Sequence, residues 1–270
     1  MTLSTSLRMY GAGPRAAAAW HALFGRVFDE LGLEVRPIEH RWPEPVETLW
    51  ARSDLCCDFM CGWPFQRAAG AMQPIAAPVP SPARYAGLPR YCSEFLVRAD
   101  SGWTGLEQTF GHRFGWMVAN SQSGFNAPRA HLAAHVDRPG GKLFREVQGP
   151  LGTPARTLEA LRSAVVDVVA LDSFWLDLSR RHQPDALAGT RCVAVTAWTP
   201  IPLLVAAPGV DRDIVESLRA RLTALHTDAA FAALLADVLV ERFVVPKVAD
   251  YETLQAMADL AKARGYETIR

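Results

Sequence analysis

Residues 14–31 read PRAAAAWHALFGRVFDEL, and this stretch sets the class of fold. Its apolar side chains recur at alternating intervals of three and one, which is the pattern of a helix with one face against a core. Strand-like segments flank it at 3–9 and 33–38, followed by a short helix at 46–52 and a strand at 55–61. This alternation of strand and helix predicts an α/β fold with a mostly parallel sheet. The apolar stripe of the helix comprises Trp20, Leu23, Phe24, Val27, Phe28 and Leu31.

The alternation continues along the rest of the chain. Five prolines between 74 and 90 predict a loop, and a second Gly/Pro-rich loop is expected at 138–141. Further strands are expected at 91–98, 113–119, 165–171, 191–198 and 203–206. Further helices are expected at 106–110, 124–135, from 154, from 174, and at 211–225, 228–239 and 251–263.

Two of these strand-like segments are expected to join two halves of the molecule. Segments 91–98 and 191–206 would cross between two Rossmann-like lobes, one made of 1–95 plus 200–270 and the other of 96–199. A chain that leaves a lobe and returns makes a two-stranded hinge. Ligands favour the crevice between such lobes.

Composition excludes several classes of protein. The chain has 270 residues, 28 Lys+Arg and 28 Asp+Glu, and half of its residues are apolar, which argues against disorder. A net charge of zero argues against binding of nucleic acid or of anionic membranes, and no apolar run is long enough for a membrane span. The motifs of covalent or cofactor-dependent enzymes are absent, so we expect neither catalysis nor a cofactor. His131 and His135 share a helical face without a further ligand at a diagnostic spacing, so no metal site is expected.

The sequence carries two indications of the compartment. The first ten residues lack a basic segment followed by an apolar one, so they do not resemble a secretory signal. The five cysteines are odd in number and show no disulfide framework. Both features favour a reducing, cytoplasmic setting.

The sharpest local feature is the stretch from Asn120 to Arg129, NSQSGFNAPR, which follows a strand and opens a helix. Backbone N–H groups at a helix N-terminus favour anions, and the serine hydroxyls would add donors. The alternative is that Ser123 merely caps its helix. The candidate ligand-binding residues here are Ser121, Gln122, Ser123, Gly124 and Asn126.

Further candidates also stand where strands end. Asp172 ends the strand 165–171, where a carboxylate could either meet a ligand or cap the next helix. Thr153 begins a neighbouring helix and is expected to be mainly a cap. The remaining candidates are Gly62 and Trp63 after the strand 55–61, Tyr91 at a crossing and Tyr10 after the first strand, although such aromatic side chains are as often part of a core.

In order and spacing, these motifs resemble the phosphate/phosphonate-type substrate-binding proteins of ABC transporters, which have the type 2 periplasmic-binding fold. The resemblance spans nearly the whole chain. It rests on Leu7-Arg8-Met9-Tyr10, Cys61-Gly62-Trp63-Pro64, Pro89 to Ser93 with Val97 to Ser101, Ser121 to Ala127, Val166 to Ser173 and Thr199-Pro200-Ile201-Pro202.

The resemblance implies a periplasmic solute-binding protein that closes on a small anionic or zwitterionic ligand and serves an ABC transporter permease. It implies that Ser121, Ser123, Gly124 and Tyr91 line the anion end of the site, and that Asp172 meets the polar or cationic end. The chain departs from the pattern at Gly152-Thr153-Pro154, which lacks a histidine, and at Gln122, which replaces a small hydroxyl residue. A carboxylate, a zwitterion or a heterocycle therefore stays open beside a phosphonate.

Two other functions stay open as well. Some enzymes of menaquinone and thiamine pathways resemble this architecture, and a cytosolic ligand sensor would also fit the N-terminus.

Overall fold

The computed structural model describes residues 2–68, 70–136 and 141–270, so most of the loop expected at 138–141 lies outside the described residues. The chain divides into two compact units, Met1–Arg90 with Pro200–Ala249 and Tyr91–Thr199 with Asp250–Arg270. It therefore passes between the units three times, and β5 (Arg90–Tyr91) and β11 (Thr199–Pro200) form a two-stranded sheet at two of these passages. The expected lobes placed all of 200–270 in the first unit. The structure instead groups Asp250–Arg270 with the second unit, because the last helix packs against a helix of that unit.

The first unit contains a two-stranded parallel sheet and a four-stranded antiparallel sheet rather than the mostly parallel sheet expected. β1 (Leu3–Thr5) pairs in parallel with β2 (Val35–Pro37), and Ser4 bridges in parallel to Leu55. The other pairs are antiparallel, and they involve strands that lie far apart in the sequence. β12 (Leu203–Ala206) lies between β3 (Asp58–Met60) and β4 (Gln73–Pro80). β13 (Val240–Val244) pairs with the other side of β4.

Strand β4 contradicts the loop predicted for the proline-rich stretch from 74 to 90. Proline cannot donate a ladder hydrogen bond, yet Pro74 lies opposite Val205 and Pro80 opposite Val240. The register shifts beside both of these pairs, whereas Pro78 lies opposite Phe243 without a shift. Arg219 of α7 (Arg212–Ala224) also donates to the carbonyl oxygens of Pro74 and Ile75, at 2.5 and 3.3 Å.

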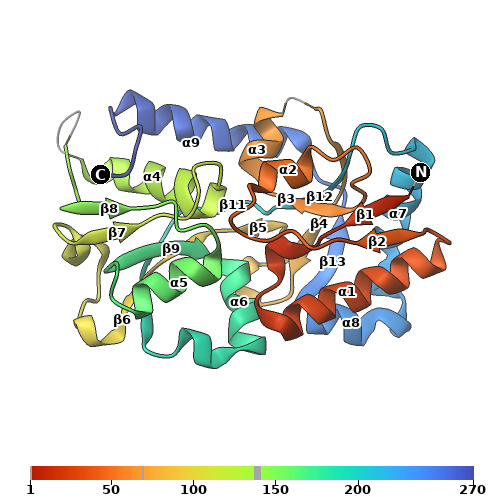
Figure 1. Cartoon of the computed structure of the whole chain (residues 1–270), viewed down its shortest axis with the longest axis horizontal. Helices are drawn as coiled ribbons and strands as arrows, with labels where there is room; N and C mark the ends of the chain where they lie inside the picture. The colour runs from red at the N-terminus through yellow and green to blue at the C-terminus, as the bar shows by residue number, and fades with distance from the viewer. Residues whose placement is uncertain (1, 69, 137–140) are drawn as a thin grey trace. The chain divides into compact units, whose positions relative to one another are not determined.

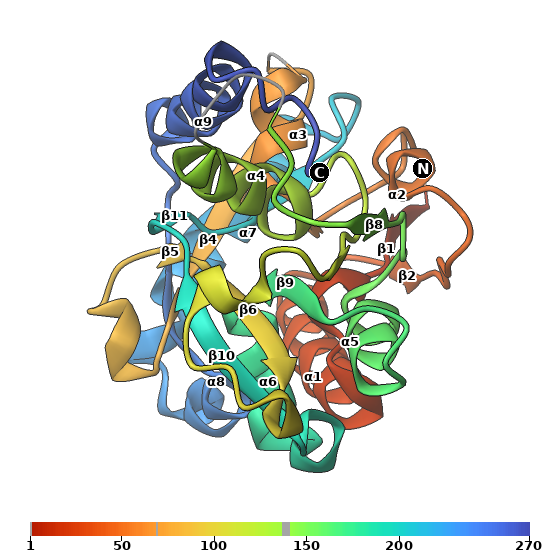
Figure 2. The ribbon, with the colours of Figure 1, turned by 90° about the vertical axis from the view of Figure 1, so that its left-hand side faces the viewer.

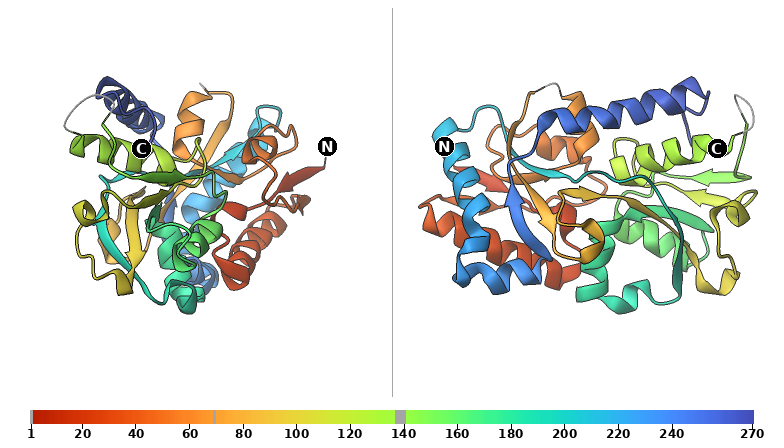
Figure 3. Two further views of the ribbon diagram at one scale, coloured as in Figure 1. Left: turned by 60° about the vertical axis from the view of Figure 1, so that its left-hand side comes forward. Right: turned by 180° about the vertical axis from the view of Figure 1, so that it is seen from behind.

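Helix α1 (Gly13–Glu30) confirms the helix predicted from the apolar stripe. Its side chains from Trp20 to Phe28 on that stripe are buried, and the ring of Phe24 meets Phe243 of β13 edge-on at 6.3 Å. Figures 1 and 3 show α1 beside α8 (Ala232–Asp237), which packs against it. The other helices of this unit are α2 (Val46–Trp50) and α3 (Gly62–Arg67).

The second unit is built on a five-stranded sheet with the strand order β10-β6-β9-β7-β8. β9 (Val168–Asp172), β7 (Arg113–Gly115) and β8 (Glu146–Gln148) run parallel, whereas β6 (Ser93–Arg98) is antiparallel to β9 and to β10 (Thr190–Val195). Figures 1 and 2 show α4 (Ala127–Leu132) and α9 (Glu252–Ala263) on one side of this sheet, and α5 (Pro154–Arg162) and α6 (Ser173–His182) on the other. Across the described ranges, none of the helices has the length and apolar character needed to cross a membrane.

Candidate functional site

Three helical segments begin at one edge of the sheet in the second unit. β9, β7 and β8 are parallel neighbours, so their carboxyl ends lie at the same edge, which is where open α/β sheets bind ligands. The chain leaves β7 for the turn at Ser121, leaves β8 for Thr153 at the start of α5, and leaves β9 for Asp172 at the start of α6. The structure therefore places these sequence-predicted candidates along one edge.

The turn after β7 differs from the helix start that the sequence predicted. Residues Gln122–Asn126 form a π turn, in which the N–H of Asn126 donates to the carbonyl oxygen of Ser121 at 3.0 Å. The cap is Ser121, not Ser123: Ser121 Oγ accepts the Gly124 N–H at 2.9 Å. Among residues 2–68, 70–136 and 141–270, the hydroxyl of Ser123 makes no hydrogen bond to another residue, although Ser123 is only 6% exposed. The Ser123 hydroxyl can therefore both donate and accept a further hydrogen bond.

Gly124 lies where no larger residue fits. A Cβ atom added there would be 2.6 Å from Met117 Cβ and 3.1 Å from Ser121 Oγ. The close approach lets the Met117 N–H donate to the Gly124 carbonyl oxygen at 3.3 Å, while the Met117 carbonyl oxygen accepts the Gly152 N–H at 3.0 Å. Through Met117, the structure brings the Ser121–Gly124 turn next to Thr153.

Thr153 and Asp172 both cap helices. Helix capping was the main expectation for Thr153 and the alternative to ligand binding for Asp172. Thr153 Oγ1 accepts the Arg156 N–H at 3.2 Å. Asp172 Oδ1 accepts the N–H groups of Phe174 at 2.7 Å and Trp175 at 3.0 Å, which occupies the first donors of α6. The hydroxyl of Thr153 can still donate its O–H, since a threonine that accepts one hydrogen bond can donate another.

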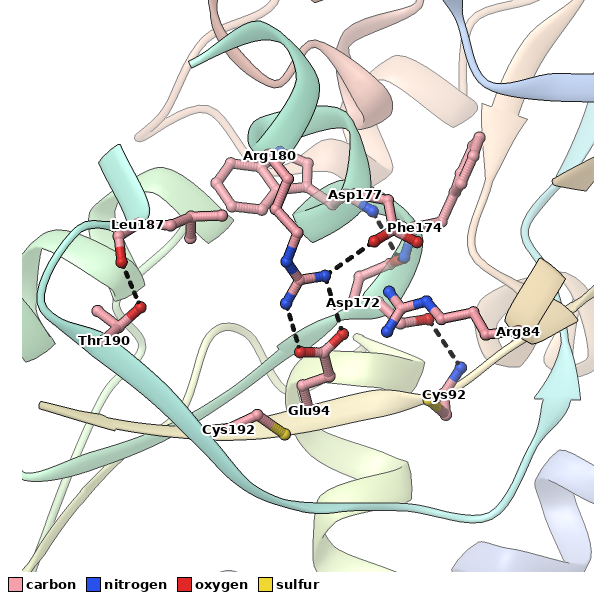
Figure 4. Close-up of polar contacts among 12 residues, drawn as sticks. Arg84, Cys92, Glu94, Asp172, Phe174, Asp177, Arg180, Leu187, Thr190 and Cys192 are labelled. Carbon is pink, nitrogen blue, oxygen red and sulfur yellow. Dashed lines mark hydrogen bonds and ion pairs between the residues drawn. The ribbon is translucent and has the colours of Figure 1, made fainter. Parts of the chain in front are cut away.

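The helix that Asp172 caps is fixed to the sheet by an ion-pair cluster. Figure 4 shows Arg180 of α6 between Glu94 of β6 and Asp177. Its Nη2 donates to Glu94 Oε2 at 2.7 Å and its Nη1 to Asp177 Oδ1 at 2.8 Å. The side chain of Glu94 is only 3% exposed, so the ion pair is largely shielded from water on the Glu94 side. It connects α6, the helix that Asp172 caps, to strand β6.

Gln122 and Asn126, two of the predicted ligand-binding residues, make hydrogen bonds inside the protein. Both are fully buried. Asn126 Nδ2 donates to Gln122 Oε1 at 2.8 Å and to the carbonyl oxygen of Leu254 at 2.9 Å, and its Oδ1 accepts from Arg129 at 2.7 Å. These contacts lie within the protein because α9 covers this side of the turn. No local sequence pattern predicted that α9 would pack there.

The first-unit candidates lie after β1 and β3. The ring of Tyr10 is buried, stacks on Trp20 at 6.3 Å and meets Phe59 edge-on at 5.0 Å, so it belongs to the core. Gly62 and Trp63 form the first turn of α3, where the guanidinium of Arg67 lies over the Trp63 ring at 5.3 Å. In the second unit, Tyr91 is buried at the end of β5.

Sequence reasoning missed a buried carboxylate that shapes the loop before Tyr10. Asp58 accepts backbone N–H bonds from Ser6 at 2.7 Å, Leu7 at 3.2 Å and Phe59 at 2.7 Å. Burial raises the pKa of Asp58 to about 6, although these N–H groups and the nearby Arg8 charge oppose that shift. An acid inside the apolar run 55–61 was the signal that could have drawn attention to it.

A polar cavity after β1 and β2 was also missed. It has a volume of about 350 Å³ and lies beside His40, which is hydrogen-bonded to Arg8 through Nδ1 and to Thr48 through Nε2 at 2.9 Å. Burial and the charge of Arg8 lower the pKa of His40. The residues around the cavity are Arg36, Pro37, Ile38, Glu39, His40, Glu44, Thr48 and Arg52. Within the described parts of the chain, no three His, Cys, Asp or Glu side chains are placed to share a metal ion.

Solved structures share this fold over nearly the whole chain. The binding protein component of an ABC phosphonate transporter from Pseudomonas aeruginosa aligns with a TM-score of 0.82 at 15% identity, covering 97% of this chain and 87% of that one. PhnD1 from Prochlorococcus marinus, solved in complex with methylphosphonate, aligns with a TM-score of 0.77 at 16% identity, covering 98% of each chain. A Xanthomonas citri protein solved with ATP aligns at 0.64 with 17% identity, over 98% of this chain and 97% of that one. These likenesses confirm the periplasmic-binding fold.

The sequence itself identifies the family. No curated protein sequence matches the chain. Residues 58–251, however, match the family described as ABC transporter, phosphonate, periplasmic substrate-binding protein. That segment includes the Ser121–Gly124 turn, Thr153 and Asp172, and it confirms the resemblance drawn from the motifs. The chain therefore belongs to the family of periplasmic substrate-binding proteins of ABC phosphonate transporters, and its function is to bind a solute.

Proposed function

We propose that this solute is a small oxyanion, a phosphonate or phosphate in the first instance, held at the edge where β7 and β8 end. The observation that carries the proposal is that the hydroxyl of Ser123 makes no hydrogen bond to another of the described residues. Ser121 lies in the same turn and Thr153 follows β8 at the same sheet edge; each uses its oxygen as an acceptor and still has an O–H to donate. Such donors suit the oxygens of an anion and add no formal charge.

The family supports the rest of the proposed role. Its members are transport binding proteins, so we place this chain in the periplasm, delivering its ligand to an ABC permease rather than acting as an enzyme or a cytosolic sensor. We propose Tyr91, Gly62 and Trp63 as further contacts of the ligand. Cell fractionation with a tagged chromosomal copy tests this placement: recovery in the cytoplasmic fraction alone would contradict it.

Calorimetric titration tests the ligand site. The wild type is titrated with methylphosphonate, inorganic phosphate, malate and glycine. Replacing Ser123 by Ala should weaken binding of the preferred anion by about 10- to 100-fold, because hydrogen bonds to charged groups contribute ~1.5–3 kcal/mol. Ser163→Ala is the matched control, since Ser163 is exposed and its hydroxyl donates to the Glu159 carbonyl oxygen at 2.7 Å. Equal affinity in wild type and Ser123→Ala would refute the assignment.

Asp172 distinguishes an anion from a zwitterion. Asn is as good a helix cap as Asp, so Asp172→Asn keeps the bonds to Phe174 and Trp175 while it removes the negative charge. A ligand with an ammonium group near Asp172 should bind the variant less tightly. A simple anion should bind it equally well or more tightly, since a like charge has gone.

A further inference from the structure

The π turn at Gln122–Asn126 requires support from outside itself. Turns of this type are rare, and they occur mostly as single turns at functional sites. Ser121 Oγ fixes its start by accepting the Gly124 N–H. The far end of the turn is fixed by side chains that reach away from it, toward the C-terminal segment.

Asn126 is the centre of these contacts. Its Nδ2 donates to Gln122 Oε1 within the turn and to the Leu254 carbonyl oxygen of α9, at 2.8 and 2.9 Å. Gln122 Nε2 reaches the sulfur of Met257 one helical turn further along, at 3.4 Å. Both side chains of the turn therefore end on the same helix.

Arg129 extends the network to the end of the chain. Its Nη2 donates to Asn126 Oδ1 at 2.7 Å and its Nη1 to the Glu267 carbonyl oxygen at 2.8 Å. The three side chains are 0%, 0% and 8% exposed for Gln122, Asn126 and Arg129. Asn126 thus makes bonds in three directions, and removing it would leave buried donors and acceptors unsatisfied.

We propose that Asn126, together with Gln122 and Arg129, acts as a positioning residue that fixes the Ser121–Gly124 turn on α9. The C-terminal segment Glu252–Arg270 is then part of the binding machinery and acts on the ligand through the turn. This role rests on the proposed function, since it assumes that the turn holds the ligand. Asn126 itself faces α9, so it shapes the site and does not touch the ligand.

The test compares Asn126→Ala with Asp167→Asn by methylphosphonate titration and by hydrogen exchange. Asp167 is a suitable control because it pairs with Arg113 at the amino ends of β7 and β9, in the same unit but away from the turn. Asn126→Ala should raise the Kd by about tenfold or more and speed amide exchange at 121–126 and 252–257 together. Asp167→Asn should lower thermal stability but keep the Kd within twofold and leave exchange at the turn unchanged.

Arg129→Lys provides a milder variant, since lysine keeps the charge and replaces the two-pronged contact by a single group. It should give a smaller loss of affinity and a smaller increase in exchange than Asn126→Ala. Unchanged exchange at 121–126 in both variants, or a Kd within twofold of wild type in both, would overturn the proposal. If wild type binds none of the four probes, the proposed function fails, whereas the exchange experiment still decides whether Asn126 holds the turn.

Discussion

Gly124→Ala places a methyl group at the tightest point of the proposed site. The added Cβ would lie 2.6 Å from Met117 Cβ, and optimal carbon–carbon contact is about 3.5 Å, so Gly124 must move away from Met117, and relative to Ser121, by about 0.9 Å. A shift of that size would stretch the 2.9 Å bond between Gly124 N–H and Ser121 Oγ beyond hydrogen-bonding range. Overpacking of this kind costs ~1–3 kcal/mol in unfolding free energy. Displacing Ser121 and Ser123 should also weaken binding by about tenfold or more.

Gly25→Ala is the matched control. Gly25 lies inside α1, and a Cβ there meets nothing within 4 Å. Alanine in a helix interior should stabilise the protein by ~0.5–1 kcal/mol, with no change in affinity. Urea unfolding followed by circular dichroism measures the stabilities, and methylphosphonate titration measures the affinities. If Gly124→Ala were as stable as wild type and bound as tightly, the geometry argued for the turn would be refuted.

Three further predictions concern buried groups. Arg113 holds the pKa of Asp167 at about 2, below its usual 3.8. The ion pair therefore contributes ~2 kcal/mol to the unfolding free energy above pH 3.8, and this contribution is lost as the pH falls through about 2. Asp167→Asn should lower the unfolding free energy by that amount at pH 7, and an equal difference between variant and wild type at pH 2 would contradict this. Burial raises the pKa of Asp58 from 3.8 to about 6, so the contribution of Asp58 to stability is full below pH 3.8 and is lost as the pH rises through about 6. Relative to Asp58→Asn, the wild type should lose unfolding free energy across that pH interval in urea titrations. Curves of unfolding free energy against pH that run parallel for the two proteins would argue against this. Cys192 is exposed, whereas the other four cysteines are buried, and burial raises the pKa of the Cys56 thiol to about 12. One thiol should therefore react with a disulfide reagent in the native protein and five in denaturant. Fast labelling of several thiols in the native protein would rule out the burial of these four cysteines.

The parts of the fold predicted from sequence are those encoded locally. The stripe from Trp20 to Phe28 predicted α1 because a helix places those residues on one face. Strand β4 was missed because its prolines indicate a loop, and only its partners β12 and β13 and the side chain of Arg219 make a strand possible there. β13 was missed for the same reason, since its pairing with β4 joins residues far apart in the chain.

The site shows the same division. The positions at strand ends were predictable because parallel strands present their carboxyl ends at one edge. The roles of the residues there were not. Whether Ser121 or Ser123 caps the turn depends on its π geometry, and the burial of Asn126 depends on Leu254, which lies 128 residues further along the chain. The assignment of 250–270 to the first lobe failed because these contacts attach α9 to the second unit.

A crystal structure of the complex with methylphosphonate tests the central claim most directly. We expect a phosphonate oxygen within hydrogen-bonding distance of Ser123 Oγ, with the O–H groups of Ser121 and Thr153 directed at the same group. Ligand density away from the Ser121–Gly124 turn, with the Ser123 hydroxyl still without a partner, would contradict it.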